Sequence, residues 1–274
     1  AVDTPVVIGA GDGSMANVGA GSISPGKTYS SMGTSAWITT TSLQPIYDEE
    51  MRTVTWCHAI PGLYAPNGTM QAAGASYSWL KDTICRYETE EARKQGVSPY
   101  QNINEQVEMS PPGSNGVLFL PYLMGERAPR WNPDAKGAFL GITMDTDAPM
   151  LYRALIEGVT YEMMYNLEKL EEFGISMSVL RAVGGGSKSP YWLQMKADIL
   201  GKAIIPLDLD EAGIAGTAML SGVCCGVYQS LEEAEKLFVK KKQPYEPNME
   251  LHQAYLKHYQ RFKMVRQMIA DVFR

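Results

Sequence analysis

A single carboxylate in a glycine-rich turn is the strongest candidate for chemistry in this sequence. Asp12 lies between Gly11 and Gly13, after the apolar run 6–8 and before small residues that suit a helix. The apolar run predicts a buried strand, so Asp12 would stand where a strand ends and a helix begins. The helix dipole favours an ionised carboxylate there, and the glycines let a substrate hydroxyl approach, as a general base requires. A helix-capping role explains Asp12 equally well, and this segment alone does not separate the two interpretations.

Two further glycine-rich loops could bind an anion or a nucleotide. Residues 33–35 (Gly-Thr-Ser) join two predicted strands, and their N–H groups and hydroxyls could form a small anion-binding concavity or only a β-turn. Residues 184–186 are three glycines between a predicted strand and a helix. A nucleotide could lie there against bare backbone, with its phosphates near the helix start, although close packing would explain the glycines too. Lys188 could contact phosphate or only solvent.

Neither of two common nucleotide motifs is complete. The pattern G-x-G-x-x-G would need glycine at Ser14 and an uninterrupted helix, but Gly19 and Gly21 follow. A nicotinamide-dependent dehydrogenase is therefore a weak alternative. The pattern G-x-x-x-x-G-K-[ST] would need glycine at Ala182 and Ser187, so the second glycine run is not a Walker A loop.

The composition excludes several classes of protein. A net charge of −6 speaks against a nucleic-acid partner, because phosphate binding needs a basic surface. No apolar run approaches the length of a membrane span. The four cysteines lack C-x-x-C spacing and the three histidines lie far apart, so we expect no metal site. We interpret the cysteines as reduced, mostly buried thiols of a cytoplasmic protein.

The predicted elements define the fold class. Strands dominate the first third of the chain, and helices alternate with strands in the second half. The expected strands are 28–32, 36–40, 53–59, 117–120, 179–183 and 204–207, and the main helices are 70–87, 149–173, 190–200 and 248–274. Residues 88–116 are polar and predict a short helix and a surface loop. This order predicts an α/β protein with a mixed sheet flanked by helices.

Taken together, the motifs resemble the carboxy-terminal half of the FGGY family of carbohydrate kinases. The resemblance runs in order over nearly the whole chain. The segments that carry it are Gly11-Asp12-Gly13, Gly33-Thr34-Ser35, Ala73-Gly74-Ala75-Ser76, Gly125-Glu126-Arg127-Ala128-Pro129 with Trp131, the stretch 137–142 leading to a helix with Glu157, and the stretch 184–201. Met150 and Pro190 depart from the family pattern, and Pro190 points away from glycerol kinases.

The resemblance implies a fold and a set of site residues. The fold is the ribonuclease H-like ATPase domain of actin, Hsp70 and sugar kinases, with residues 1–274 as one carboxy-terminal, nucleotide-binding domain. The implied cofactors are ATP and Mg²⁺, and Asp12 is the implied general base for phosphoryl transfer to a sugar hydroxyl. The implied nucleotide-binding residues are Gly33, Thr34, Gly74, Gly184, Gly185 and Lys188.

The resemblance also implies partners. They are a small sugar and the amino-terminal half of the same enzyme, which is absent from this sequence and would supply most sugar contacts; a homodimer stays open. The loop around Trp131 is similar to xylulose kinases first and gluconate kinases second. The alternative from another class is a non-catalytic ATP-binding module of the actin-like fold. We expect the 274-residue chain by itself to be inactive.

Overall fold

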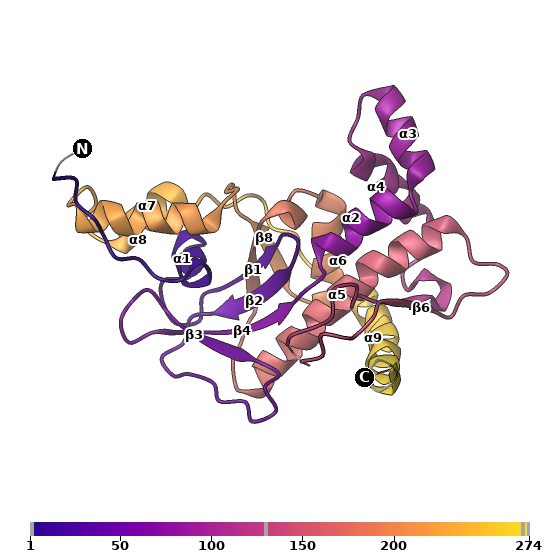
Figure 1. Cartoon of the computed structure of the whole chain (residues 1–274), viewed down its shortest axis with the longest axis horizontal. Coiled ribbons are helices and arrows are strands. Elements are labelled where there is room, and N and C mark those ends of the chain that lie inside the picture. Colours follow the sequence, from indigo (N-terminus) through magenta and orange to yellow (C-terminus); the bar gives the residue numbers. More distant parts are fainter. Residues whose placement is uncertain (1–2, 129–130, 270–271, 273–274) are drawn as a thin grey trace.

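A six-stranded mixed sheet forms the centre of the protein in the computed structural model, which describes residues 3–128, 131–269 and 272. The strand order is β3-β4-β2-β1-β7-β8 (Figure 1). Neighbours among β1 to β4 are antiparallel, whereas β7 pairs parallel with β1 and with β8. The strands are β1 (Thr28–Met32), β2 (Ala36–Thr40), β3 (Val54–Cys57), β4 (Tyr64–Met70), β7 (Val179–Val183) and β8 (Ala203–Pro206). The predicted α/β fold with a mixed sheet is confirmed.

The β1–β2 hairpin positions the first glycine turn. Its register pairs Thr28 with Thr40 and Met32 with Ala36, which leaves residues 33–35 as the connection. Successive side chains of a strand point to opposite faces. Tyr29 accordingly packs in a small core on one face of the sheet, and Ile38 packs in the main core on the other.

Helices cover both faces of the sheet. On the main-core face, α5 (Ala148–Glu172) packs against β2 and β4, and α6 (Pro190–Leu200) packs against β8. On the other face, α1 (Asp12–Gly19) packs against α7 (Ala212–Cys224), as Figure 1 shows. The remaining elements are α2 (Gly74–Thr83), α3 (Arg86–Gln95), α4 (Pro99–Met109), β5 (Leu118–Leu120), β6 (Ala138–Leu140), α8 (Leu231–Phe238), α9 (Met249–Ile269) and the 3₁₀ turns η1 (Ser114–Gly116) and η2 (Gly185–Ser187).

The segment after β4 contains more helix than the sequence predicted. Three helices, α2 to α4, occupy the region where one long helix, a short helix and a surface loop were predicted. Gly96, in the left-handed conformation, ends α3, and Pro99 occupies the first turn of α4. Ile103 and Val107 of α4 are fully buried and join the main core. Two apolar side chains a helical turn apart are therefore enough to dock a polar helix here.

The predicted strand over residues 6–8 is wrong. Val6 and Ile8 are 92% and 93% exposed, and the segment belongs to no strand of the described sheet. An apolar run becomes a strand only where a neighbouring strand offers hydrogen bonds. The sheet ends at β3 and β8, and neither edge pairs with this segment.

The cysteine prediction holds only in part. All four are free, as predicted, but Cys57, Cys224 and Cys225 are exposed and Cys85 alone is buried. The buried positions of α7 end at Met219, so its last turn, with Cys224, is not buried. Within the described part of the chain, no helix is both long and apolar enough to span a membrane.

Candidate functional site

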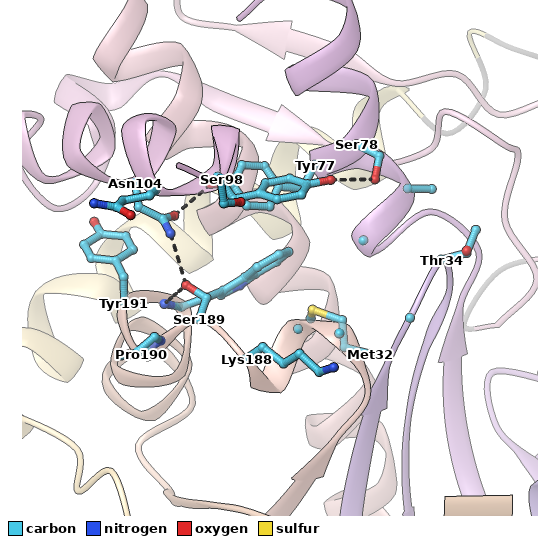
Figure 2. A pocket seen from close by; sticks show the side chains of 18 of the residues that line it. Met32, Thr34, Tyr77, Ser78, Ser98, Asn104, Lys188, Ser189, Pro190 and Tyr191 are labelled. Carbon is cyan, nitrogen blue, oxygen red and sulfur yellow. Dashed lines mark hydrogen bonds between the residues drawn. The ribbon is translucent and has the colours of Figure 1, made fainter. Parts of the chain in front are cut away.

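A cavity of about 790 Å³ lies between the β1–β2 turn, α2, α4 and the start of α6 (Figure 2). Five of the predicted nucleotide-binding residues line it, namely Gly33, Thr34, Gly74, Gly185 and Lys188. The volume is in the range of small-molecule and cofactor sites. The fold thus brings three glycine-bearing segments, far apart in sequence, to one cavity.

Backbone hydrogen bonds fix the β1–β2 turn to the start of α2. The carbonyl oxygen of Gly33 accepts from the N–H of Gly74, and that of Thr34 accepts from Ala73 and Ala75, each at 3.0 Å. A Cβ atom on Gly74 would lie 2.3 Å from the Gly33 oxygen. A Cβ on Gly33 would meet no atom within 4 Å. Gly74 is therefore glycine for packing, whereas Gly33 leaves bare backbone facing open space.

Residues 184–186 also include both kinds of glycine, those that packing requires and one that faces open space. A Cβ on Gly184 would lie 2.6 Å from the backbone oxygen of Met32, and its φ of +85° suits only glycine well. A Cβ on Gly186 would lie 2.4 Å from the sulfur of Met32, but one on Gly185 would meet nothing within 4 Å. Gly184 is not among the lining residues. It shapes the turn that presents Gly185 to the cavity.

A hydrogen-bonded chain of side chains closes the far wall of the cavity (Figure 2). The Tyr77 hydroxyl donates to Asn104 Oδ1 at 2.7 Å, and Asn104 Nδ2 donates to Ser189 Oγ at 3.3 Å. Ser189 Oγ also accepts from the N–H of Trp192 and so caps α6. The sequence did not predict this wall, because residues 88–116 indicated only a short helix and a surface loop. Ser189 before Pro190 is a helix-start signal that could have indicated part of it.

Lys188 lies at the rim of the cavity. Its ammonium pairs with Asp210 at 2.6 Å, and the two side chains are 69% and 79% exposed. The hydrogen bond to Asp210 raises the pKa of Lys188 above its ordinary value, so the side chain stays cationic. An exposed pair of this kind contributes little to stability and exchanges partners readily.

Asp12 is the first residue of α1 and is exposed. The N-cap of α1 is Gly11, and Asp12 Oδ1 accepts from the N–H of Gly13 at 2.8 Å. Asp12 does not line the cavity. Burial raises the pKa of Tyr29, and the negative charge of Asp12 adds to that rise. Asp12 therefore lies on the side of β1 that faces α1 and α7. The carboxylate is free for chemistry but stands apart from the cavity.

Glu157, which the resemblance marked on the long helix, has a structural role. It is buried and accepts from Arg153 Nε at 2.7 Å, Gly113 N at 2.9 Å and Ser114 Oγ at 3.0 Å. Arg153 also donates to the hydroxyl of Tyr191, a residue that lines the cavity. Burial raises the pKa of Glu157, while Arg153 opposes that rise. The Arg153–Glu157 pair holds residues 113–114, which follow α4, behind the cavity wall.

The loop around Trp131 does not line this cavity. Trp131 is 57% exposed, and its Nε1 donates to Met51 O at 3.2 Å. Pro129, part of the family resemblance, lies outside the described residues. Among the residues that the structure describes, no three His, Cys, Asp or Glu side chains group as a metal site.

A family model matches this architecture. Residues 28–225 match the FGGY family of carbohydrate kinases, C-terminal domain. That range covers most of the chain and includes β1, the glycine turns and α6. The chain belongs to the FGGY family of carbohydrate kinases.

Individual relatives agree with the family. The chain is 32% identical to the xylulose kinase of Staphylococcus epidermidis over 98% of its own length and 53% of that kinase. It is 34% identical to the gluconokinase of Bacillus subtilis over 84% of its length and 45% of that enzyme. The ligand-bound xylulose kinase of Lactobacillus acidophilus superposes with a TM-score of 0.89 at 27% identity, over 100% of this chain and 53% of that one. The chain thus spans about half the length of the relatives it matches.

Proposed function

We propose that this chain is the nucleotide-binding half of an ATP-dependent sugar kinase. The observation that carries the proposal is the cavity, because two glycines, Gly33 and Gly185, expose bare backbone to it just beyond the ends of the neighbouring parallel strands β1 and β7. A nucleotide can approach such backbone closely, and N–H groups of tight turns bind phosphate. The actin-like fold class and family membership support the same assignment.

In this proposal the nucleotide binds between the glycine turns. Gly33 and Thr34 hold phosphate oxygens, and Gly185 lies against the nucleoside. Gly74 and Gly184 shape the two turns from behind, since their backbones touch Gly33 and Met32. Lys188 leaves Asp210 for a phosphate oxygen when the nucleotide arrives. Mg²⁺ enters with ATP and neutralises charge on the transferred group.

Asp12 is the proposed general base. It accepts the proton of the sugar hydroxyl as that oxygen attacks the γ-phosphorus, and ADP leaves with the pair of electrons of the broken P–O bond. A base placed in this way contributes about 10²–10⁴-fold. Because Asp12 lies outside the cavity, the sugar would bind between the carboxylate and the phosphate end of the nucleotide.

The proposed substrate is D-xylulose, which gives xylulose 5-phosphate, with gluconate as the second candidate. Similarity to relatives named xylulose kinase and gluconokinase supports both sugars at nearly equal identity. The amino-terminal half of the enzyme would supply the other wall of the cleft and most sugar contacts. A cytoplasmic location, where ATP is available, belongs to the same proposal.

Turnover across a sugar panel tests this function. The chain, joined to its amino-terminal half, is assayed for ADP release with xylulose, ribulose, gluconate, glycerol and fuculose. We expect turnover with xylulose or gluconate, lowered about 10²–10⁴-fold in Asp12→Asn with ADP affinity nearly unchanged. Asp145→Asn, an exposed loop variant, serves as the control. ATP binding without turnover of any sugar would favour the non-catalytic module, and an active Asp12→Asn would refute the base.

A further inference from the structure

A buried lysine lies directly behind the wall of the proposed nucleotide site. Lys196 on α6 is 1% exposed, and its ammonium donates to the carbonyl oxygen of Gly186 at 3.3 Å. The same ammonium lies over the ring of Trp192, 5.3 Å from its centroid. Gly186 and Trp192 both line the cavity. One layer of atoms therefore separates this cation from the space that a nucleotide would fill.

Among the described residues, no carboxylate pairs with Lys196. Burial lowers the pKa of Lys196 from 10.5 to about 7. The elements packed against α6 include α5, α9, β8 and η2. Several charged groups on or beside these elements and on α6 itself have other partners: Arg153 with Glu157, Arg266 with Glu162, His252 with the Asp198 carbonyl, Asp198 with Gln194, and Lys188 with Asp210. An unpaired buried cation is costly, so its site gains from an anion nearby.

We propose that Lys196 is a positioning residue of the nucleotide site, whose ammonium holds the Gly185–Ser187 turn and draws the nucleotide's negative charge toward it. This inference rests on the proposed function, because it presumes that the cavity binds a nucleotide. Lys196 touches no substrate and acts through Gly186. Its charge changes near neutral pH, just behind this wall.

The sign of the pH effect follows from linkage. An anion bound across Gly186 favours the protonated ammonium, so it raises the pKa of Lys196 above its value of about 7 in the empty site. Nucleotide binding therefore takes up protons between these two pKa values, and affinity falls as pH rises through that window. Below the lower of these two pKa values, the Lys196 ammonium is already charged without nucleotide, so its titration no longer changes the affinity.

Calorimetric titration with Mg·ADP tests the proposal. We expect binding about five- to tenfold weaker at pH 8.5 than at pH 6.5, with fractional proton uptake at pH 8, where ADP is fully ionised. Lys196→Met keeps most of the apolar stem but removes the charge. It should bind about tenfold more weakly at pH 6.5 and lose the pH dependence. Lys202 follows α6 and pairs with Glu171. The control variant Lys202→Met should keep the pH profile of the native protein.

The outcomes separate the inference from the function on which it rests. Mg·ADP binding with the same pH profile in Lys196→Met would overturn the role of Lys196 and leave the nucleotide site intact. Absence of ADP binding at every pH would instead contradict the proposed function. If Lys196→Met fails to fold, the unmodified protein decides: no proton uptake at pH 8, measured in two buffers of different ionisation enthalpy, refutes the inference.

Discussion

The glycines around the cavity are glycine for two different physical reasons. Gly74 and Gly184 touch backbone oxygens, so a side chain there would displace the turn or the helix behind it. Gly33 and Gly185 have open space where a Cβ would stand. Packing gives no reason for glycine at the second pair, whereas the nucleotide proposed for the cavity would give one.

This difference predicts opposite effects for the same substitution. Gly74→Ala should lower the free energy of unfolding by about 2 kcal/mol, because a methyl group meets a backbone carbonyl that cannot easily move. Gly185→Ala should change it by less than about 0.5 kcal/mol and weaken ADP binding severalfold. Urea unfolding and calorimetry measure the two effects. A large loss of stability in Gly185→Ala, with unchanged ADP affinity, would contradict this division.

At the residue scale, the sequence predicted that Gly33, Gly74 and Gly185 belong to one site, and all three line the cavity, but it did not predict which of them pack against backbone and which face open space. Motif order alone could not separate Gly33 from Gly74, because contact with a distant carbonyl leaves no local pattern. Asn104 and Lys196 were missed for a related reason. Each matters only through a neighbour many residues away, Ser189 for the first and Gly186 for the second.

At the scale of elements, the close crossing of α1 and α7 determines where Asp12 stands. A Cβ on Gly19 would lie 1.8 Å from the Ala212 oxygen, and one on Gly216 would lie 2.0 Å from the Met15 oxygen. The two helices therefore pack backbone against backbone. Any side chain at the crossing would force α1 and α7 apart, and so would displace Asp12 at the start of α1.

Alanine substitutions on α7 test this crossing. Gly216→Ala should lower the free energy of unfolding by about 2 kcal/mol, since its methyl group would overlap α1. Gly213→Ala is the matched control, because its Cβ would lie 3.8 Å from the backbone oxygen of Asp12, an ordinary contact. Because alanine has a higher helix propensity than glycine, the free energy of unfolding of Gly213→Ala should equal that of the native chain or exceed it by about 0.5–1 kcal/mol. Equal urea midpoints for both variants would show that the helices are not in close contact.

The loop after β5 carries a buried acid that makes stability depend on pH. Glu126 is 4% exposed; its Oε1 accepts from the N–H groups of Gln71 and Arg127, at 3.0 and 2.8 Å. Its Oε2 is buried without a partner among the described residues. Burial, helped by the charge of Glu162, raises the pKa of Glu126 from 4.5 to about 8. The folded protein therefore holds this proton to higher pH than the unfolded chain does.

Glu126→Gln isolates this effect. The stability that the raised pKa contributes is complete below pH 4.5 and is lost as pH rises through about 8. Glutamine imitates the protonated acid, so the variant should match the native protein near pH 5 and exceed it by about 1–3 kcal/mol at pH 8.5. Denaturant unfolding at both pH values, with exposed Glu49→Gln as control, measures the gap. A constant gap would mean that Glu126 is charged in the folded state.

The sequence predicted elements well where local patterns are strong and poorly where distant contacts decide. β1, β2, β7 and α6 have the bounds that were predicted, because turn glycines and Pro190 mark their ends. The α3–α4 pair was predicted only as a short helix and a loop, because most of its side chains are polar and only a few are buried. The run 6–8 was predicted as a strand from its composition, which says nothing about whether a neighbour is present.

At the scale of the whole molecule, the proposed function gives the chain one wall of a cleft. It spans about half the length of its relatives, and the cavity and Asp12 lie apart within it. We therefore expect the 274-residue chain to bind Mg·ADP and to release no ADP from ATP with any sugar of the panel. A coupled ADP-release assay measures this. Sugar-dependent turnover by the chain alone would show that the proposed missing half is not required.

The central claim is that the cavity between the β1–β2 turn, α2, α4 and α6 holds the nucleotide. The most direct test is a crystal structure of the protein with Mg·ADP. The account predicts ADP in this cavity, with phosphate oxygens at Gly33 and Thr34 and the nucleoside against Gly185. ADP bound elsewhere on the chain, with this cavity left to solvent, would contradict it.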